Sequence, residues 1–185
     1  MTIVCLGWGS LIWCQKALPV RGAWCTDGPD LPLEFARQSR DKRITLVICK
    51  GVPETRTLWA ELDVKTRNDA KVVLAVREGV KHVNINSSIG FWSSADNSGG
   101  IGATAIGLWA TAQNFEGVVW TALKPRIAGV YRTPSQKEVI DHLRSLQDLD
   151  RDRAEEYIRF APQQIQTQYR PAIEKEFSWK PKGLT

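Results

Sequence analysis

The stretch "CLGWGSLIW", residues 5–13, ends the first apolar run of the chain and raises the question of what its glycines do. Residues 3–6 are β-prone and predict a buried strand, after which Gly7 and Gly9 permit a tight turn. A loop of this kind can instead present its backbone amides to an anion, because glycine lets a ligand approach the main chain closely. The stretch alone leaves both interpretations open.

Length and composition predict one domain that spans residues 1–185. The chain has 185 residues, 43% of them hydrophobic, which is enough for one good core and short for two. No apolar run reaches the length of a membrane span, and the N-terminus lacks the basic region and cleavage site of a signal peptide. We therefore expect a cytoplasmic protein with no membrane partner.

The cysteines predict neither a zinc site nor a redox motif. The four cysteines are Cys5, Cys14, Cys25 and Cys49. They form no C-x-x-C pair and have no histidine at ligand spacing, so we expect no metal. Their even number leaves disulfides open, although this density in a chain of this size is typical of the cytosol. Buried, unpaired hydrophobes are the simplest interpretation.

The net charge of +5 raises the question of a polyanionic partner. The densest basic group is Arg37, Arg40, Lys42 and Arg43, just before an apolar run at 44–49. Four cations beside a strand are more often a solvated edge than a nucleic-acid site, and the chain carries no RNA- or DNA-binding motif. Nucleic acid is therefore not the expected partner, and a small acidic substrate suits the same charge.

Hydrophobic periodicity predicts strands mixed with unevenly spaced helices. Residues 3–6, 44–49 and 58–64 read as strands, and 58–64 alternates between two faces. A helix is expected from Thr66, capped by Asp69, to Gly79. Residues 80–85 read as another strand, followed by a long loop over 86–102.

The second half of the chain reads as more helical. A helix over 105–112 is expected to end at Gly117, before a strand at 118–123. The next helix is expected to begin with Thr133 as N-cap, Pro134 as first residue and Gln136 completing a capping box. Its buried stripe would be Val139, Ile140, Leu143 and Leu146, and further helices are expected at 151–161 and 173–177. Without strict β-α alternation, this order favours the α+β class with a mixed sheet.

Most catalytic constellations are absent from the sequence. His142 lies within an expected helix, and His82 has no serine or cysteine motif to serve. The nucleophile elbow, the Walker A loop and the dinucleotide fingerprint are all missing. A Ser-His-Asp hydrolase and a metalloenzyme are therefore weak hypotheses, and no cofactor is expected.

One carboxylate, Glu78, is placed as a candidate base. Ala70, Leu74 and Glu78 are spaced four apart, so they share one side of their helix with the apolar Val73. Desolvation and the negative end of a helix dipole both make a carboxylate a stronger base. The alternative is that Glu78 forms an ion pair with Arg77 or Lys81 at a frayed helix end.

These features together resemble the γ-glutamylcyclotransferase family. Its members carry an aromatic-Gly-Ser loop after the first strand, which matches Trp8, Gly9, Ser10 and Leu11. They also carry a catalytic glutamate in an element similar to "REGV" at residues 77–80, which places Glu78 in that role. "LEFARQSR", "TLWAELDV" and "TPSQKEVIDHL" resemble further family segments, and residues 3–85 carry most of the likeness.

The resemblance implies a small mixed β-barrel, closed or nearly closed, with surrounding helices. It implies an enzyme without cofactor, in which the α-amine of a γ-glutamyl compound attacks its own γ-carbonyl to give 5-oxoproline and a free amine or peptide. Amides of residues 9–11 would hold the substrate's carboxylate or developing oxyanion, and Glu78 would transfer the proton.

The chain departs from the family pattern at aromatic positions. Trp8 stands where the family usually has tyrosine, and Lys137 and Glu138 occupy the region of a late-helix tyrosine, with Tyr131 just ahead. These changes leave open a noncatalytic ligand-binding member of the same fold. A third alternative is a basic nucleic-acid-associated protein using the cations around Arg40, whose affinity would fall steeply with salt.

Overall fold

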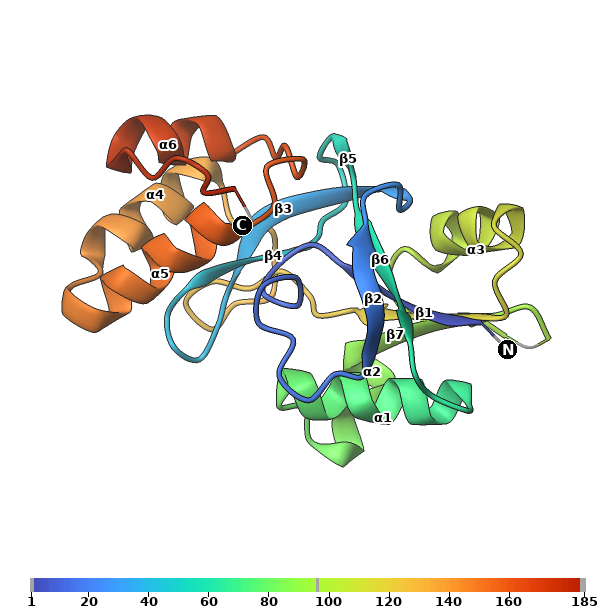
Figure 1. Ribbon diagram of the computed structural model, residues 1–185. Helices are drawn as coiled ribbons and strands as arrows, with labels where there is room; N and C mark the ends of the chain where they lie inside the picture. The colour runs from blue at the N-terminus through green and yellow to red at the C-terminus, as the bar shows by residue number, and fades with distance from the viewer. Residues whose placement is uncertain (1, 96, 184–185) are drawn as a thin grey trace. The chain divides into compact units, whose positions relative to one another are not determined.

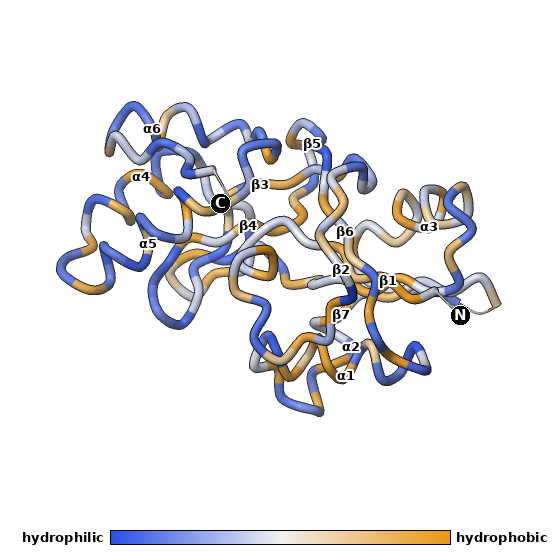
Figure 2. Tube along the Cα trace, viewed as in Figure 1, coloured by the Kyte–Doolittle hydropathy of each residue, from blue (hydrophilic) through white to orange (hydrophobic). Residues whose placement is uncertain are grey.

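Strand β1 (Ile3–Gly7) is the central strand of a five-stranded sheet in the computed structural model, which describes residues 2–95 and 97–183 (Figure 1). It pairs antiparallel with β6 (Leu58–Leu62) and parallel with β8 (Gly117–Thr121). All five residues of β1 are buried, which explains its unbroken apolar sequence, drawn in orange in Figure 2. The strand expected over residues 3–6 is confirmed.

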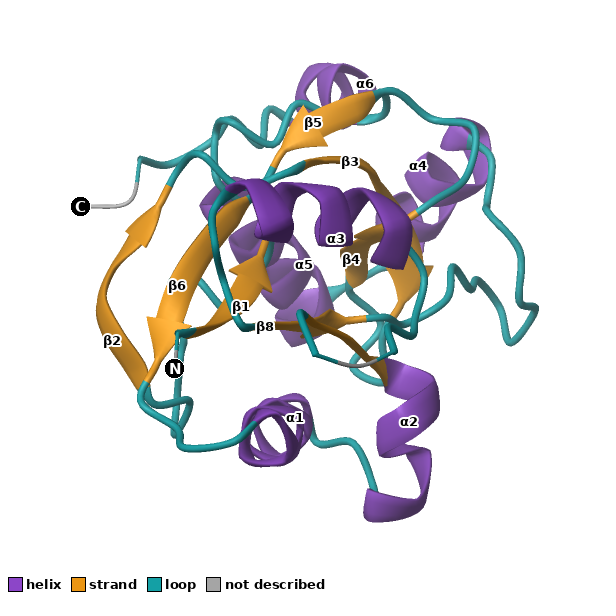
Figure 3. Cartoon of the chain, turned by 90° about the vertical axis from the view of Figure 1, so that its right-hand side faces the viewer, coloured by secondary structure: helices purple, strands orange, loops and turns teal. Residues whose placement is uncertain are grey.

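The five-stranded sheet is mixed and has the strand order β2-β6-β1-β8-β7. Its edges are β2 (Val20–Cys25) and β7 (Ile89–Ser93). Figures 1 and 3 show α1 (Arg67–Glu78) and α3 (Ala103–Ala112) on opposite sides of this sheet, and both pack on β7 and β8. These elements belong to a first compact unit, which consists of residues through Gly7, Cys14–Leu31 and Arg56–Leu123.

A second compact unit is built mostly from a smaller sheet and the C-terminal helices. Its strands, in the order β4-β3-β5, are β3 (Asp30–Gln38), β4 (Ile44–Ile48) and β5 (Glu54–Arg56). Its helices are α4 (Gln136–Ser145), α5 (Asp148–Phe160) and α6 (Arg170–Phe177). Helix α5 packs on β4, and α4 packs on α6. The unit comprises Trp8–Trp13, Pro32–Thr55 and the chain from Lys124 onward.

The α+β class is confirmed, and the barrel is not. The described residues form six α-helices and two sheets, and within that part of the chain no sheet closes into a barrel. Each sheet has two distinct edge strands, β2 and β7 in one and β4 and β5 in the other. The expectation that residues 1–185 form one domain stays a prediction.

Helix α1 forms where the sequence places it. Thr66 is the N-cap, and its side chain and that of Asp69 exchange hydrogen bonds with each other's backbone N–H groups in a capping box. Gly79 ends the helix in the left-handed conformation, with φ of 64°. This conformation favours glycine, because a Cβ is strained there. The boundaries expected from Thr66 and Gly79 are confirmed.

The start of α4 differs from the expectation by two residues. The N-cap is Ser135, whose side chain accepts from Glu138 N–H, while the Glu138 carboxylate accepts from Ser135 N–H at 2.8 Å. The expected cap Thr133, first residue Pro134 and capping-box Gln136 were therefore wrong. Glutamate completes the box better than glutamine, because a charged acceptor lies at the positive end of the helix dipole. Val139, Leu143 and Leu146 are buried, whereas Ile140 of the expected stripe is half-buried.

Residues 80–102 were misjudged in two places. Residues 80–85, expected as a strand, contain a 3₁₀ turn at His82–Asn84 and the first residue of α2 (Ile85–Ser88). Val83 is 86% exposed, so no burial rewards an extended conformation there. Residues 86–102, expected as a loop, contain β7, which pairs antiparallel with β8. Its Gly90 has no room for a side chain, because a Cβ would lie 2.2 Å from the Trp120 ring.

No strand was expected at β2, β3 or β5, although Leu31, Leu33 and Phe35 of β3 alternate along the strand and are buried. Strand β2 pairs irregularly with β6, and its Gly22 has φ of 76°. Strand β3 contains a buried glutamate, Glu34, and a bulge between Phe35 and Arg37. The helix expected over 105–112 was also expected to end at Gly117. The observed helix, α3, ends at Ala112, and Gly117 is the first residue of β8. The other expected strands and helices are confirmed with shifts of a few residues at their ends.

The position of the α4 cap is testable. Ser135→Ala is expected to lower the free energy of unfolding by about 1 kcal/mol, because the Glu138 N–H loses its acceptor. The control is Ser94→Ala, which changes an exposed serine outside any helix. Urea denaturation followed by circular dichroism measures both. Equal stability of the two variants would show that Ser135 does not cap α4.

Candidate functional site

The first motif of the expected site is a turn that directly follows β1, and its tryptophan anchors it to the second sheet. Trp8 is buried, and its indole Nε1–H donates to the Leu46 carbonyl oxygen of β4 at 3.2 Å. The Ile12 N–H donates to the Gly9 carbonyl oxygen at 3.0 Å and closes the turn. Ser10 is half-buried and Leu11 is buried. Trp8 therefore has a structural hydrogen bond in addition to its aromatic surface.

Gly9 is required by a close contact with a tyrosine. A Cβ on Gly9 would lie 2.3 Å from the hydroxyl oxygen of Tyr157, a distance that real Cβ contacts do not reach. Tyr157 comes from α5 and is 5% exposed. The absence of a side chain at Gly9 therefore lets a phenol hydroxyl approach the backbone of the loop.

Tyr157 is a residue that the sequence did not single out. Its hydroxyl oxygen accepts a hydrogen bond from Leu46 N–H at 3.2 Å, so β4 is bonded to both Trp8 and Tyr157 through one residue. Its ring meets Trp13 edge-on at a centroid distance of 5.5 Å, and the Arg43 guanidinium lies 5.5 Å from its centroid. The only signal available was a tyrosine three residues after the apolar Ala154, and both residues are buried.

The second motif of the expected site lies at the C-terminal end of α1. Ala70 and Leu74 are buried, as the stripe predicted, and the Glu78 side chain is 17% exposed. The neighbouring Arg77 side chain is only 6% exposed, and its Nη1 lies 2.6 Å from Glu78 Oε1. Arg77 Nη2 donates to the Cys14 carbonyl oxygen, also at 2.6 Å. The alternative interpretation of Glu78 as an ion-pair partner is therefore realised with Arg77.

The charge of Glu78 affects the pKa of a buried cysteine in the first unit. Burial first, and then the negative charge of Glu78, raise the pKa of the Cys5 thiol in β1, while the positive charge of Arg77 lowers it. Cys5 is thus held as a neutral thiol, because a thiolate would be both desolvated and repelled. A buried neutral thiol is a poor nucleophile, so Cys5 has the surroundings of a structural cysteine.

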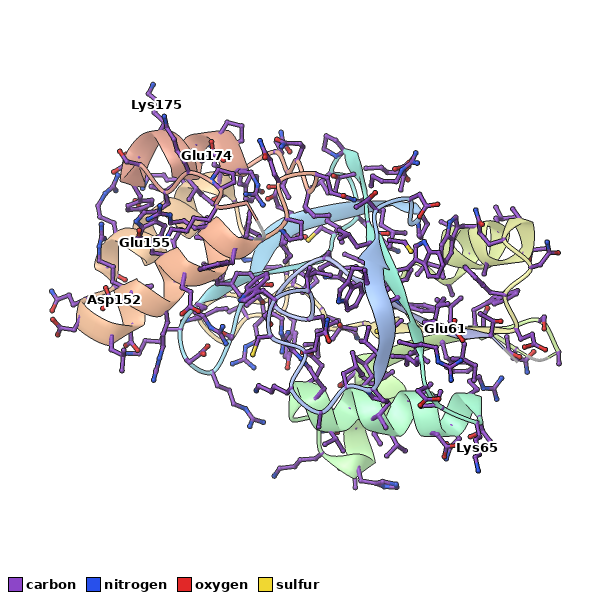
Figure 4. The ribbon with its side chains drawn as sticks, viewed as in Figure 1. Glu61, Lys65, Asp152, Glu155, Glu174 and Lys175 are labelled. Atoms are coloured by element: carbon purple, nitrogen blue, oxygen red, sulfur yellow. The ribbon has the colours of Figure 1, made fainter. Side chains whose placement is uncertain are left out.

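The expected site residues fall into two local structures. Trp8, Gly9, Ser10 and Leu11 form one turn in the second unit, and Glu78 belongs to the first unit. Two hollows in the described residues include none of them. One, of about 340 Å³, is lined by residues 27–30, Arg56, two residues of α3 and Gln113 just after that helix. The other, of about 220 Å³, is lined by Asp152 and Glu155 of α5, labelled in Figure 4, with four neighbours.

The remaining candidate residues have structural surroundings. His142 Nε2 lies 2.6 Å from the Lys42 carbonyl oxygen, and His82 is exposed in the 3₁₀ turn. All four cysteines are free: Cys5 and Cys49 are buried, Cys25 is half-buried and Cys14 is exposed. Within residues 2–95 and 97–183, no group of three or more histidines, cysteines or carboxylates is placed to hold a metal ion. No helix in the same residues has the length and apolar content needed to cross a bilayer.

Ion pairs neutralise half of the basic group at residues 37–43. Lys42 Nζ lies 2.6 Å from Asp150, and Arg43 Nη2 lies 2.7 Å from Asp41. Arg37 donates instead to the carbonyl oxygen of Lys124. These contacts support the solvated-edge interpretation of Lys42 and Arg43, because a paired charge attracts a polyanion less.

Comparison of the chain with protein-family models, curated proteins and solved structures finds no match. The resemblance to the γ-glutamylcyclotransferases therefore rests on the motifs themselves.

The contact between Gly9 and Tyr157 is testable by a double-mutant cycle. Gly9→Ala is expected to lower the free energy of unfolding by about 1–3 kcal/mol, because the new methyl group overlaps the phenol oxygen. In a Tyr157→Phe background the nearest ring atom would be 3.2 Å away, so the same substitution should cost less. Urea denaturation of the four proteins measures the coupling. An equal cost of Gly9→Ala in both backgrounds would show that the contact is absent.

Proposed function

We propose that this chain is a γ-glutamylcyclotransferase-like enzyme that converts a γ-glutamyl compound into 5-oxoproline and a free amine or peptide. The observation that carries the proposal is the position of Glu78, a mostly buried carboxylate on the last residue of α1, directly before a left-handed glycine. The "REGV" element that resembles the family's catalytic segment thus has a glutamate held in one place by its helix and by Arg77. The glycine turn that directly follows β1 is the second support.

In the proposed reaction, Glu78 moves one proton. It accepts this proton from the α-ammonium of the γ-glutamyl group, and the freed amine attacks the γ-carbonyl carbon to form a five-membered ring. The attacking nitrogen then loses its surplus proton to solvent, the C–N bond to the leaving amine breaks, and Glu78 passes its own proton to that amine. The attack is intramolecular, so positioning of the substrate supplies much of the rate and no cofactor is needed. Backbone amides of residues 9–11 are assigned to the oxyanion or the α-carboxylate.

The ion pair with Arg77 is compatible with this role. The guanidinium contacts one carboxylate oxygen, Oε1, at 2.6 Å, and it is itself oriented by the Cys14 carbonyl. Arg77 is then a positioning residue, which fixes the rotamer of the base. The hydroxyl of Tyr157 beside Gly9 is assigned the role of the aromatic hydroxyl that Trp8 lacks.

The proposal includes the finer expectations drawn from the family. These are a closed or nearly closed mixed barrel, a small-molecule γ-glutamyl substrate and a cytoplasmic location. The four free cysteines support the cytoplasmic assignment, because disulfides are rare there. The alternative of a noncatalytic ligand-binding member would keep the same motifs and give no product.

Turnover is the first test. We expect 5-oxoproline from at least one member of a panel of γ-glutamyl amino acids, γ-glutamyl amines and glutathione, detected by mass spectrometry. The reaction should proceed without added metal or nucleotide, and EDTA should leave its rate unchanged, because intramolecular aminolysis requires only a base and amide donors. If no compound in the panel yields product at high enzyme concentration, the noncatalytic alternative replaces the enzyme proposal.

Glu78→Gln tests the base. It keeps the size of the side chain and an acceptor for Arg77 but removes proton transfer, so turnover should fall by about 10²- to 10⁴-fold, mainly in kcat. Because it also breaks a mostly buried ion pair, we expect a loss of about 1–3 kcal/mol in the free energy of unfolding. Rates are therefore measured well below the melting temperature of the variant.

Glu61→Gln is the matched control. Glu61, labelled in Figure 4, lies on β6 of the same unit and pairs at 3.2 Å with the exposed Arg21. Its removal should change stability by less than about 1 kcal/mol and leave turnover unchanged. If Glu78→Gln lowers only stability and keeps full turnover, Glu78 is an ion-pair partner alone. If Glu61→Gln abolishes turnover instead, the base has been assigned to the wrong residue.

A further inference from the structure

Two arginines in the second unit are held side by side by the backbone. Gln38 N–H donates to the Arg126 carbonyl oxygen at 2.7 Å, and Arg126 N–H donates to the Ala36 carbonyl oxygen at 3.0 Å. These two bonds form a parallel bridge that pairs Arg37 of β3 with Arg126. Backbone hydrogen bonds therefore hold the two arginines next to each other, although their positive charges repel.

The resulting cluster brings like charges together without a carboxylate. Burial, and then the positive charge of Arg126, lower the pKa of Arg37. Lys124 adds a third cation, and its carbonyl oxygen accepts from Arg37 Nη1 at 2.5 Å. In the described part of the chain, no salt bridge joins any of these three residues to an acid, and Arg126 Nε is buried there without an acceptor.

An exposed tyrosine completes the cluster. The Arg126 guanidinium lies 5.7 Å from the ring centroid of Tyr131, which is 63% exposed. A hydrogen bond from Arg126 is the largest cause that lowers the pKa of Tyr131, and the charges of Arg37 and Lys124 add to it. The phenol therefore lies close to positive charge.

We propose that Arg37, Lys124, Arg126 and Tyr131 form a binding site for the phosphate group of a small molecule, such as a phosphomonoester or a diphosphate. Arginine forks match phosphate oxygens in geometry, and assembling like charges is unfavourable unless an anion offsets them. Three cations match a multiply charged phosphate, whereas a carboxylate or a single phosphodiester would neutralise only one of them. The site is independent of the proposed cyclotransferase chemistry.

Calorimetric titration of the full-length chain with inorganic phosphate and with pyrophosphate, at constant ionic strength, tests the site. We expect pyrophosphate to bind more tightly than phosphate. Arg126→Gln and Arg37→Gln should each weaken pyrophosphate binding by about tenfold or more, because each removes a charge-assisted donor pair. Both keep the backbone bridge, so the fold should survive. Arg40→Gln, the same charge change at an exposed residue outside the cluster, should alter binding by less than about twofold.

The ionisation of Tyr131 gives a second readout that does not depend on affinity. Bound pyrophosphate should offset the cations and move the phenolate absorbance of Tyr131 to higher pH, and Tyr131→Phe should remove that transition. The proposal is overturned if pyrophosphate does not bind. It is also overturned if Arg126→Gln and Arg40→Gln weaken binding equally, since that indicates diffuse charge, or if a single-stranded oligonucleotide binds while pyrophosphate does not compete with it.

Discussion

The pairing of β1 on both of its edges is the constraint on which the first unit depends. Strand β1 pairs with β6 on one side and with β8 on the other, and all of its residues are buried, so neighbours surround it on both edges and both faces. The strand therefore fixes where the chain leaves the sheet, at Gly7, and so where the glycine turn begins. Helix α1 packs on the same sheet, mainly on β8 and β7 and also on β1.

Local signals of the sequence were sufficient where one chemical device determines one boundary. Helix α1 has a capping box at Thr66 and a left-handed glycine at Gly79. Each of these signals involves only residues that are close to it in the sequence. The same reasoning failed at α4, where Thr133-Pro134 mimics a cap but Glu138 reaches back to Ser135 instead. Helix α4 has two possible N-caps two residues apart, Thr133 and Ser135, and only the positions of the side chains show which one is used.

Other features depend on partners distant in sequence. Strand β7 forms because Trp120 fills the space that Gly90 leaves, and neither residue signals the other. Tyr157 lies 148 positions after Gly9 in the chain (157 − 9). The sequence could therefore indicate that Gly9 belongs to a turn, but it could not predict the contact with Tyr157 that requires a glycine there. The candidate site was thus predictable as two motifs, Trp8–Leu11 and Glu78. The hydroxyl beside the first was not predictable, because packing and not pattern brings it there. The Arg77 guanidinium beside the second was named as an ion-pair partner, but its burial was not predicted.

The four thiols differ in a way that bears on how the two units open. Cys5 lies in the first unit and Cys49 in the second, each is fully buried, and burial is the main cause that raises the pKa of both, to about 12 for Cys49. A thiol reagent needs an exposed thiolate, so each of these cysteines reacts only when its own surroundings open. The chain thus contains one intrinsic exchange probe for each unit. Their two labelling rates, compared under native conditions, distinguish a molecule that opens as a single cooperative body from one whose halves open separately.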